Sequence, residues 1–258
     1  MKQDQKRIIP TLKDMKQVYE NYTEEDHQVW QILYDRQIKN IPDAASIEFI
    51  QGLRHVGFNR ERIPNFEETN LILANLTGWE LVAVEGIVDD KLFFQLLSEK
   101  KFPATTWLRT MEELDYLEEP DMFHDVFAHV PLLANQHFVD FLQQLSSIAL
   151  ECLNNRWAIE LLSRIYWFTV EFGLIQEEAG LRIYGAGILS SAGETKFSLS
   201  KDPVRNHYDV GRILDTGYRK DKFQEQYFII GSYEELYHSI PAVKNELKAR
   251  MQEMQMAS

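Results

Sequence analysis

The spacing of apolar residues along the chain predicts a mainly helical protein. The first predicted helix begins after Thr23 and ends at Pro42. Its apolar face consists of Val29, Trp30, Leu33 and Tyr34. Two more helices are predicted over residues 44–56 and 66–76, and each is followed by a glycine of the kind that ends helices. We expect all three to be scaffold.

Short strands interrupt this helical pattern. Residues 79–84 are rich in Val and Leu, which indicates a strand, and a helix is predicted over residues 90–97. Residues 102–109 are expected to be extended, and residues 121–175 to form three helices with short breaks. Further strands are predicted at residues 181–184 and 227–230, and further helices at 205–214 and after Ser232. The predicted fold class is mainly α with a few short β-strands.

The composition favours one domain. The 258 residues are 45% hydrophobic, enough for one sizeable core, and no Pro-, Gly- or Ser-rich linker divides them. Residues 1–20 carry five lysines and arginines but few apolar side chains, which is typical of a solvated arm. We therefore expect a flexible arm over residues 1–20 and a single domain over residues 21–258.

Charge and cysteine content exclude several classes of partner. With 27 basic and 40 acidic residues the formal net charge is −13, so a nucleic-acid backbone or an anionic membrane would be repelled. Cys152 is the only cysteine and cannot form an internal disulfide. No apolar run has the length of a signal or membrane-spanning segment. We expect a cytoplasmic protein that binds neither nucleic acid nor membranes.

Two histidines five positions apart, His124 and His129, are candidate metal ligands. In a regular α-helix this spacing would turn the two side chains about 140° apart. They can face one ion if His124 lies at an irregular helix start after Pro120, or if the helix widens by a π-type turn. The spacing alone leaves open that the two histidines are neighbours by chance.

Glu171 is the candidate third ligand. On the predicted helix its neighbours three and four positions away are Trp167, Phe168, Leu174 and Ile175, all apolar. A carboxylate among apolar side chains needs a cationic partner or a metal ion. Two imidazoles and one carboxylate form the ligand set that leaves open positions on a non-haem Fe(II) ion. The alternative is a solvent-facing ladder with Glu160 and Arg164.

Three stretches carry further motifs: residues 119–133 read EPDMFHDVFAHVPLL, residues 165–174 read IYWFTVEFGL, and residues 184–191 read YGAGILSS. Together they resemble the pterin-dependent aromatic amino acid hydroxylases, and most of all the bacterial members that hydroxylate phenylalanine. The similarity is dense from Tyr22 to Ser232. One departure is Ala128, where the family usually has Gly, next to His129.

The resemblance implies the catalytic-domain fold of that family over residues 21–258, with Fe(II) held by His124, His129 and Glu171. It implies hydroxylation of L-phenylalanine to L-tyrosine with O₂ and tetrahydrobiopterin or a related tetrahydropterin. The family's eukaryotic members add a regulatory domain and a tetramerisation helix, for which this chain has no room. We therefore expect a monomer that acts on a small amino acid.

The resemblance also assigns residues to the amino acid substrate and to the pterin. The substrate residues are Arg109, Glu119, Pro120, Trp167 and Ser190, and Phe123 is expected in the same pocket. The pterin residues are Gly86, Phe93 and Asp125. Tyr166, Ser190 and Glu194 are expected beside the metal ligands, where they would orient them without binding the metal themselves. From the residues alone, Phe93 would be a core aromatic, and Arg109 would form a surface ion pair with Glu112 or Glu113.

Other functions fit these residues less well. A tryptophan or tyrosine hydroxylase would share the metal and pterin residues. A zinc hydrolase could use His124, His129 and Glu171 as ligands with Asp125 as base, but such enzymes place their histidines four apart. A non-enzymatic interaction module gives no reason for a buried Glu171. The Gly-rich turn at residues 185–190 lacks the third glycine of a dinucleotide-binding fingerprint.

Overall fold

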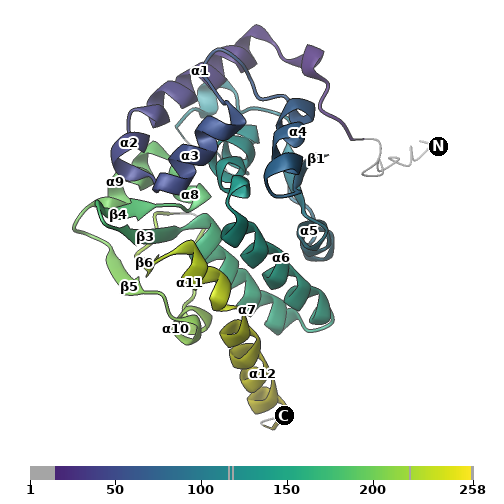
Figure 1. Cartoon of the computed structure of the whole chain (residues 1–258), viewed down its shortest axis with the longest axis vertical. Helices are drawn as coiled ribbons and strands as arrows, with labels where there is room; N and C mark the ends of the chain where they lie inside the picture. The colour runs from purple at the N-terminus through teal and green to yellow at the C-terminus, as the bar shows by residue number, and fades with distance from the viewer. Residues whose placement is uncertain (1–14, 116, 118, 221, 257–258) are drawn as a thin grey trace, which may run out of the picture.

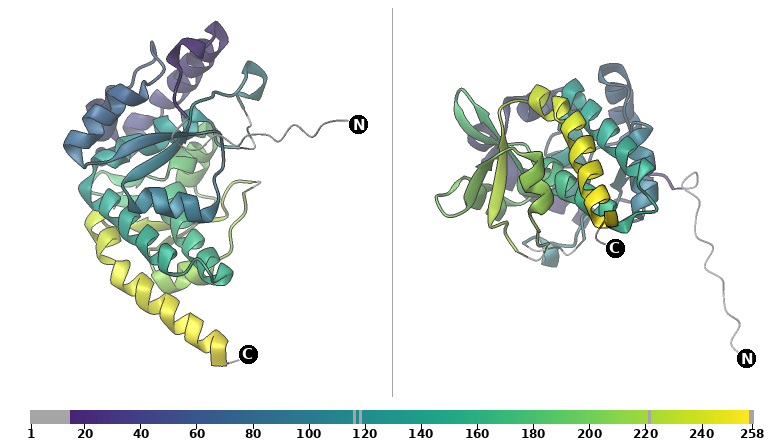
Figure 2. Two further views of the ribbon diagram at one scale, coloured as in Figure 1. Left: turned by 90° about the vertical axis from the view of Figure 1, so that its right-hand side faces the viewer. Right: turned by 90° about the horizontal axis from the view of Figure 1, so that it is seen from below.

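The structure is a computed structural model that describes residues 15–115, 117, 119–220 and 222–256. Figure 1 shows a body of helices with a four-stranded sheet at one side. The last helix, α12 (Ile240–Met256), projects from the body, as the left-hand view of Figure 2 also shows. The fold is mainly α with short strands, as predicted from the sequence. Within these residues no helix has both the length and the apolar character needed to cross a bilayer.

The first predicted helix begins after Thr23, as expected, but it ends before the predicted position, and a second short helix follows it. At the start of α1 (Glu24–Ile38) the side chains of Thr23 and Asp26 each accept a hydrogen bond from the backbone N–H of the other residue. This helix ends at Ile38, before Pro42. Pro42 instead lies in the first turn of α2 (Ile41–Ala44), where its missing N–H has no partner to lose.

The next two helices follow the predicted pattern. Ser46 caps α3 (Ile47–Val56), which ends at Gly57 with a φ of 71°, a conformation that glycine adopts without strain. Asn65 caps α4 (Phe66–Leu76). Both helices bury their apolar faces and form scaffold, as expected.

The first sheet has two strands, which are connected by a helix. β1 (Glu80–Val84) pairs in parallel with β2 (Lys101–Thr105), and α5 (Asp90–Ser98) connects them. Asp89 caps α5 by accepting a hydrogen bond from Leu92 N at 3.0 Å. The carboxyl end of β2 leads towards the predicted metal segment.

The middle of the chain contains two π-helices between regular helices. The π-helix η4 (Phe123–His129) continues into the 3₁₀-helix η5 (Val130–Ala134) and then α6 (Gln136–Glu151). After α7 (Arg156–Tyr166) the chain forms a second π-helix, η6 (Trp167–Glu171).

The second sheet corrects the prediction that residues up to 175 are helical. Its strand order is β4-β3-β6-β5, and only the β3–β4 pair is antiparallel. The helix ends at Glu171, and β3 (Gly173–Glu177) starts two residues later. A Cβ at position 173 would lie 2.1 Å from the Tyr184 ring, so only glycine permits this close pairing with β4 (Gly180–Ile183).

The predicted helix over residues 205–214 is also partly wrong. Residues in its first part form β5 (Val204–His207), which pairs in parallel with β6 (Gln226–Ile230). Asp209 then caps the short helix α10. Hydrogen bonds to a distant strand determine the conformation of this segment, and the local spacing of apolar residues gives no indication of them. The remaining elements are η2 (Tyr19–Asn21), η3 (Met111–Glu113), α8 (Ala186–Leu189), α9 (Ala192–Leu199), α10 (Val210–Asp215) and α11 (Tyr233–His238).

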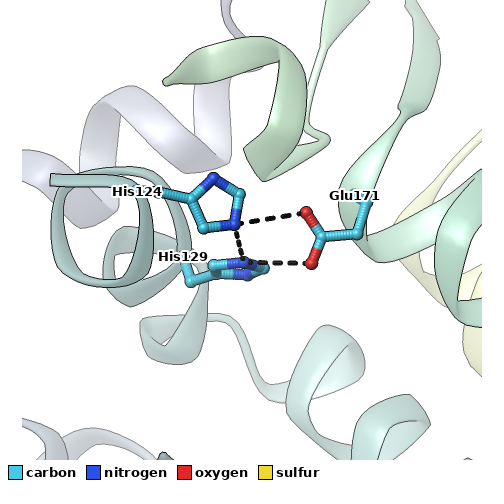
Figure 3. A group of neighbouring side chains, drawn as sticks. All are labelled: His124, His129 and Glu171. Atoms are coloured by element: carbon cyan, nitrogen blue, oxygen red, sulfur yellow. Dashed lines mark hydrogen bonds and ion pairs between the residues drawn. The ribbon is translucent and has the colours of Figure 1, made fainter. Parts of the chain in front are cut away.

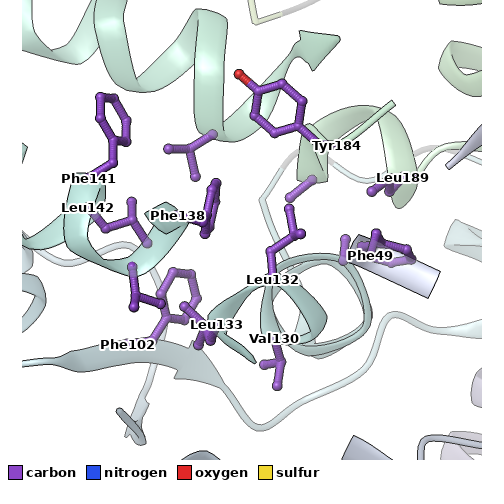
Figure 4. Packing of buried hydrophobic residues seen from close by; sticks show 14 of the residues in the cluster. Phe49, Phe102, Val130, Leu132, Leu133, Phe138, Phe141, Leu142, Tyr184 and Leu189 are labelled. Atoms are coloured by element: carbon purple, nitrogen blue, oxygen red, sulfur yellow. The ribbon is translucent and has the colours of Figure 1, made fainter. Parts of the chain in front are cut away.

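Most of the buried apolar residues form one hydrophobic cluster, and Figure 4 shows the part of it around η5. It includes Val130 and Leu132 of η5, Phe138 of α6 and Phe49 of α3. A Cβ at Gly52 of α3 would lie 1.9 Å from the carbonyl oxygen of Pro131, so the two backbones touch there. This contact fixes the segment that follows His129.

The predicted arm over residues 1–20 is only partly open to comparison, because residues 1–14 lie outside the described residues. Within the rest, the Tyr19 hydroxyl donates to Ile63 O at 2.8 Å. Gln17 donates to Pro64 O at 2.8 Å and accepts from Phe66 N at 2.8 Å. Residues 15–20 are therefore tied to the body by side-chain hydrogen bonds that composition does not reveal.

Candidate metal centre and adjoining cavities

The π-helix η4 solves the spacing problem of the two histidines. A π-turn closes over five residues, so side chains five apart lie on the same side of the helix. Pro131 has no N–H and cannot form an α-type hydrogen bond to Phe127. At the other end, Asp121 Oδ1 accepts a hydrogen bond from His124 N at 3.1 Å. Of the two geometries that the sequence allowed, the structure has the π-turn, with the buried Ala128 inside it.

His124, His129 and Glu171 point towards one another (Figure 3). The two Nε2 atoms are 3.3 Å apart, and Glu171 Oε1 lies 3.3 Å from His129 Nε2. Glu171 Oε2 lies 3.5 Å from His124 Nε2. The second π-helix, η6, carries Glu171 at its last position and so aims its carboxylate at η4.

This triangle of donors fits a divalent metal ion. One ligand atom from each of the three residues lies within 4.8 Å of the other two, so a single ion can lie about 2 Å from all three, the usual bond length of a divalent metal to imidazole nitrogen or carboxylate oxygen. Without a cation, two imidazole nitrogens and a carboxylate would crowd together in a largely buried position. Two imidazoles and one carboxylate, all on one side of an ion, match the ligand set of non-haem Fe(II) enzymes.

Ser190 holds His124 in the protonation state that a ligand needs. Its Oγ lies 2.9 Å from His124 Nδ1 and donates a hydrogen bond to Ala186 O at 2.9 Å. Since the Ser190 proton is used on the carbonyl, Oγ accepts from Nδ1–H. The lone pair of His124 then lies on Nε2 and faces the other two donors. The packing of α8 against η4 brings Ser190 to this place.

Burial and neighbouring charges act on the two acids of the centre. Burial raises the pKa of Glu171, but His129 and His124 outweigh it, so that this pKa lies below its ordinary value. Burial raises the pKa of Asp125, although both histidines and Thr105 oppose it. Asp125 Oδ2 accepts from the backbone N and the hydroxyl of Thr105, each at 2.8 Å. Asp125 is thereby fixed beside the ligands.

Two cavities meet at the triad. The smaller, of about 260 Å³, is lined by the predicted pterin residues Gly86, Phe93 and Asp125, and also by Tyr166. The larger, of about 590 Å³, is lined by residues that the sequence analysis assigned to the substrate or its surroundings. These are Arg109, Glu119, Pro120, Phe123, Trp167, Ser190 and Glu194. His124 and Glu171 line both cavities, so a ligand in either one reaches the candidate metal.

Arg109 forms a buried ion pair instead of the surface ion pair that the residues alone would predict. Its Nε and Nη2 donate to the carboxylate of Asp121 at 2.8 and 2.9 Å, and its backbone N donates to Asp121 Oδ2 at 3.0 Å. Asp121 is fully buried and Arg109 nearly so. The guanidinium is therefore held rigidly at the wall of the larger cavity.

Several residues at or behind the cavity walls were missed from the sequence. Asp121 lies inside the motif at residues 119–133, but its position in the sequence did not indicate that it pairs with Arg109. Tyr218, Lys220 and Gln224 come from the segment between α10 and β6 and line one or both cavities. That segment lies about 50 residues from Glu171 in sequence and has no periodic pattern, so only the folded chain brings it to the site.

Comparison with known proteins agrees with this arrangement. The family model described as biopterin-dependent aromatic amino acid hydroxylase matches residues 7–255. The phenylalanine-4-hydroxylase of Ralstonia nicotianae is 49% identical over 224 residues, which cover 86% of this chain and 71% of the relative. The enzyme of Chromobacterium violaceum is 46% identical over 222 residues, covering 86% and 74%.

The solved structures lead to the same family. A structure of Chromobacterium violaceum phenylalanine hydroxylase with bound iron(III) and 7,8-dihydrobiopterin superposes with a TM-score of 0.86 at 44% identity. It covers 92% of this chain, which in turn covers 85% of that chain. The sequence match, the shared fold and the candidate metal centre between two cavities agree, and the chain belongs to the biopterin-dependent aromatic amino acid hydroxylases.

Proposed function

We propose that this protein is an iron- and tetrahydropterin-dependent monooxygenase that hydroxylates L-phenylalanine to L-tyrosine with O₂. The observation that carries the proposal is the triangle of His124, His129 and Glu171, with donor distances of 3.3 to 3.5 Å, at the meeting point of two cavities. When bound, the iron and the reduced pterin supply the electrons that activate O₂ for attack on the aromatic ring.

His124, His129 and Glu171 would hold the ion, and a set of two imidazoles and one carboxylate would leave further positions open for chemistry. His124 is fixed by Ser190, while Glu171 is fixed by η6 and by its contacts with both histidines. Because these donors sit on helices rather than loops, their geometry is set before any ligand arrives.

Arg109 is the proposed partner of the substrate carboxylate. Asp121 already engages two of its nitrogens, so the guanidinium enters the cavity wall in a fixed orientation and loses little freedom on binding. Pro120, Phe123 and Trp167 offer apolar surface to the substrate ring. Apolar walls exclude water from the reacting ring and so protect the oxidant from side reactions.

The smaller cavity is the proposed pterin site. Phe93 packs edge-on against Tyr166, with ring centroids 5.3 Å apart, and both rings line this cavity. A flat pterin can stack on such an aromatic wall. Gly86 and Asp125 also line this cavity, and Asp125, held by Thr105, adds a polar group beside the candidate ligands.

Preference among aromatic amino acids depends on the far wall of the substrate pocket. A phenylalanine ring needs no hydrogen bond there, whereas burying a tyrosine hydroxyl or an indole N–H without a partner costs about 1 to 3 kcal/mol. We expect a higher kcat/KM for phenylalanine than for tryptophan or tyrosine. Competition among the three at fixed iron and pterin tests this, and a clear preference for tryptophan would favour the alternative of a tryptophan hydroxylase.

Metal analysis and O₂ uptake test the reaction class. Protein loaded with Fe(II) should consume O₂ only when tetrahydropterin and an aromatic amino acid are both present. Zinc-dependent hydrolysis without O₂ uptake would favour the zinc hydrolase instead.

We also propose that the enzyme acts as a cytoplasmic monomer, with residues 21–258 as one catalytic domain. Its net charge of −13 disfavours nucleic acid and anionic membranes as partners. Light scattering of the purified protein over a range of concentrations measures the oligomeric state.

A further inference from the structure

The indole of Trp167 is held by a residue from a distant part of the chain. Its Nε1 donates a hydrogen bond to Gln224 Oε1 at 3.0 Å. Trp167 lines both cavities, and its backbone carbonyl accepts from Phe172 N at the end of η6. The ring therefore forms part of the wall at the point where the substrate cavity, the pterin cavity and the Glu171 helix meet.

Stacking alone leaves the indole free to turn within its own plane. Tyr218 lies on Trp167 with centroids 4.3 Å apart and an interplanar angle of 17°, and the ring of Phe172 lies 4.6 Å away. Stacked rings can slide and turn in their common plane with little loss of contact. A hydrogen bond from the ring nitrogen has a preferred direction and removes this in-plane rotation.

Gln224 is itself fixed by the surrounding chain. It is only 5% exposed, and its Nε2 donates to Arg219 O at 2.8 Å and to Lys222 O at 3.3 Å. Its backbone N donates to Glu194 Oε1 at 3.1 Å. The buried Glu194 carboxylate also accepts from the Tyr227 hydroxyl in β6. Gln224 thus connects the turn before β6 to the ring of Trp167.

We propose that Gln224 is a positioning residue that sets the orientation of Trp167 and, through it, the shape of the aromatic-ring pocket. The inference rests on the proposed function and adds to it a residue that determines substrate selectivity. Gln224 acts through Trp167. A fixed indole gives the pocket one shape, which suits the phenylalanine ring, while a freely turning indole admits larger rings.

The test compares Gln224→Met with Trp167→Phe and with the double variant. Gln224→Met keeps the side-chain length but removes the acceptor, together with the Nε2 donor to Arg219 O and Lys222 O. Trp167→Phe removes the donor of the same hydrogen bond, the indole N–H, and leaves the contacts of Gln224 with the turn intact. The second variant therefore keeps the test valid if Gln224→Met fails to fold. Gln143→Met is the matched control, because Gln143 is a half-buried glutamine of α6 that donates to Ser98 O, away from both cavities.

In the iron-loaded protein, Gln224→Met should weaken phenylalanine binding, measured by calorimetry, by about three- to tenfold, the effect of one neutral hydrogen bond. The ratio of kcat/KM for tryptophan over phenylalanine should rise several-fold. Gln143→Met should match the wild type. The double variant should be no worse than Trp167→Phe, since both changes break the same bond.

Two outcomes would overturn the inference. One is a Gln224→Met protein with wild-type phenylalanine affinity and selectivity, and the other is full additivity in the double variant. Failure of the proposed function looks different. In that case the wild-type protein itself would hydroxylate no aromatic amino acid with any tetrahydropterin.

Discussion

Ser190 Oγ lies 2.9 Å from Nδ1 of His124, and this contact determines which nitrogen of the ring faces the metal centre. Ser190→Ala removes the acceptor of the Nδ1 proton and frees the ring to change tautomer. We expect metal affinity to fall by about 10- to 100-fold, the range for lost partners of metal-bound histidines. Titration with Fe(II) under anaerobic conditions measures the affinity. Ser146→Ala is the control, since Ser146 is a buried serine that donates to Leu142 O within α6.

Replacing any one of His124, His129 or Glu171 by alanine should abolish stoichiometric iron binding while the protein stays folded. Two remaining donors cannot hold the ion against water, and the triad contributes little to the hydrophobic core. Elemental analysis after desalting, combined with circular dichroism, gives both readouts. The exposed His137 provides a control. If one alanine variant retains full iron content and turnover, that residue is not a ligand.

Phe93→Ala should raise the KM for pterin about fivefold and leave the KM for phenylalanine unchanged. The lost stacking is worth on the order of 1 kcal/mol. Phe93→Leu, which keeps apolar volume but not the flat ring, should give an intermediate value. Steady-state kinetics with each substrate varied in turn measures both constants. An unchanged pterin KM would make Phe93 a core residue.

Arg109→Ala should reduce both stability and substrate binding, because it leaves the fully buried Asp121 carboxylate without its partner. Breaking a buried pair in this way destabilises by about 3 to 5 kcal/mol. Adding Asp121→Asn removes the buried charge and should restore much of the stability. It should not restore the affinity for phenylalanine, tyrosine or tryptophan, which needs the guanidinium. Denaturant unfolding and calorimetric binding separate the two effects, and full recovery of affinity would exclude Arg109 as the carboxylate partner.

Glu194 should make the wild-type protein less stable as the pH rises. Burial raises the pKa of Glu194 above 4.5, against the hydrogen bonds from Tyr227 and Gln224, so the folded state holds the proton more tightly than the unfolded state. Ionisation above pH 4.5 then favours unfolding. The melting temperature of Glu194→Gln, relative to wild type, should therefore rise from acidic to neutral pH. A difference that is constant, or that changes in the opposite direction, would contradict this.

Local patterns predicted most of the helices and, together with the family resemblance, the three candidate ligands, but not the geometry that joins them. The prediction for Glu171 rests on four apolar helical neighbours, of which Trp167 and Phe168 do share η6 with it. The other two, Leu174 and Ile175, lie in β3. The burial of Glu171 comes instead from the two histidines and the cavity walls. Strand pairing across some 50 residues, as between β3 and β6, leaves no trace in a local window. The same holds for Gln224, whose role depends on a contact with Trp167, 57 residues away.

The histidines themselves show a different limit. A spacing of five allowed either a π-turn or an irregular helix start, and residue identities alone could not choose between them. Pro131 and the contact of its carbonyl with Gly52 favour the π-turn, but the second of these is tertiary.

The π-turn of η4 also means that the metal geometry is encoded in chain length. Compared with a regular helix, η4 accommodates one extra residue between the two imidazoles. Deleting one residue between Asp125 and Ala128 would keep every ligand and would restore ordinary helical hydrogen bonding. The two histidines would then be four apart and would lie on one face of a regular helix, about 40° apart around its axis. The spacing of five and the π-turn are therefore linked, and neither can change without the other.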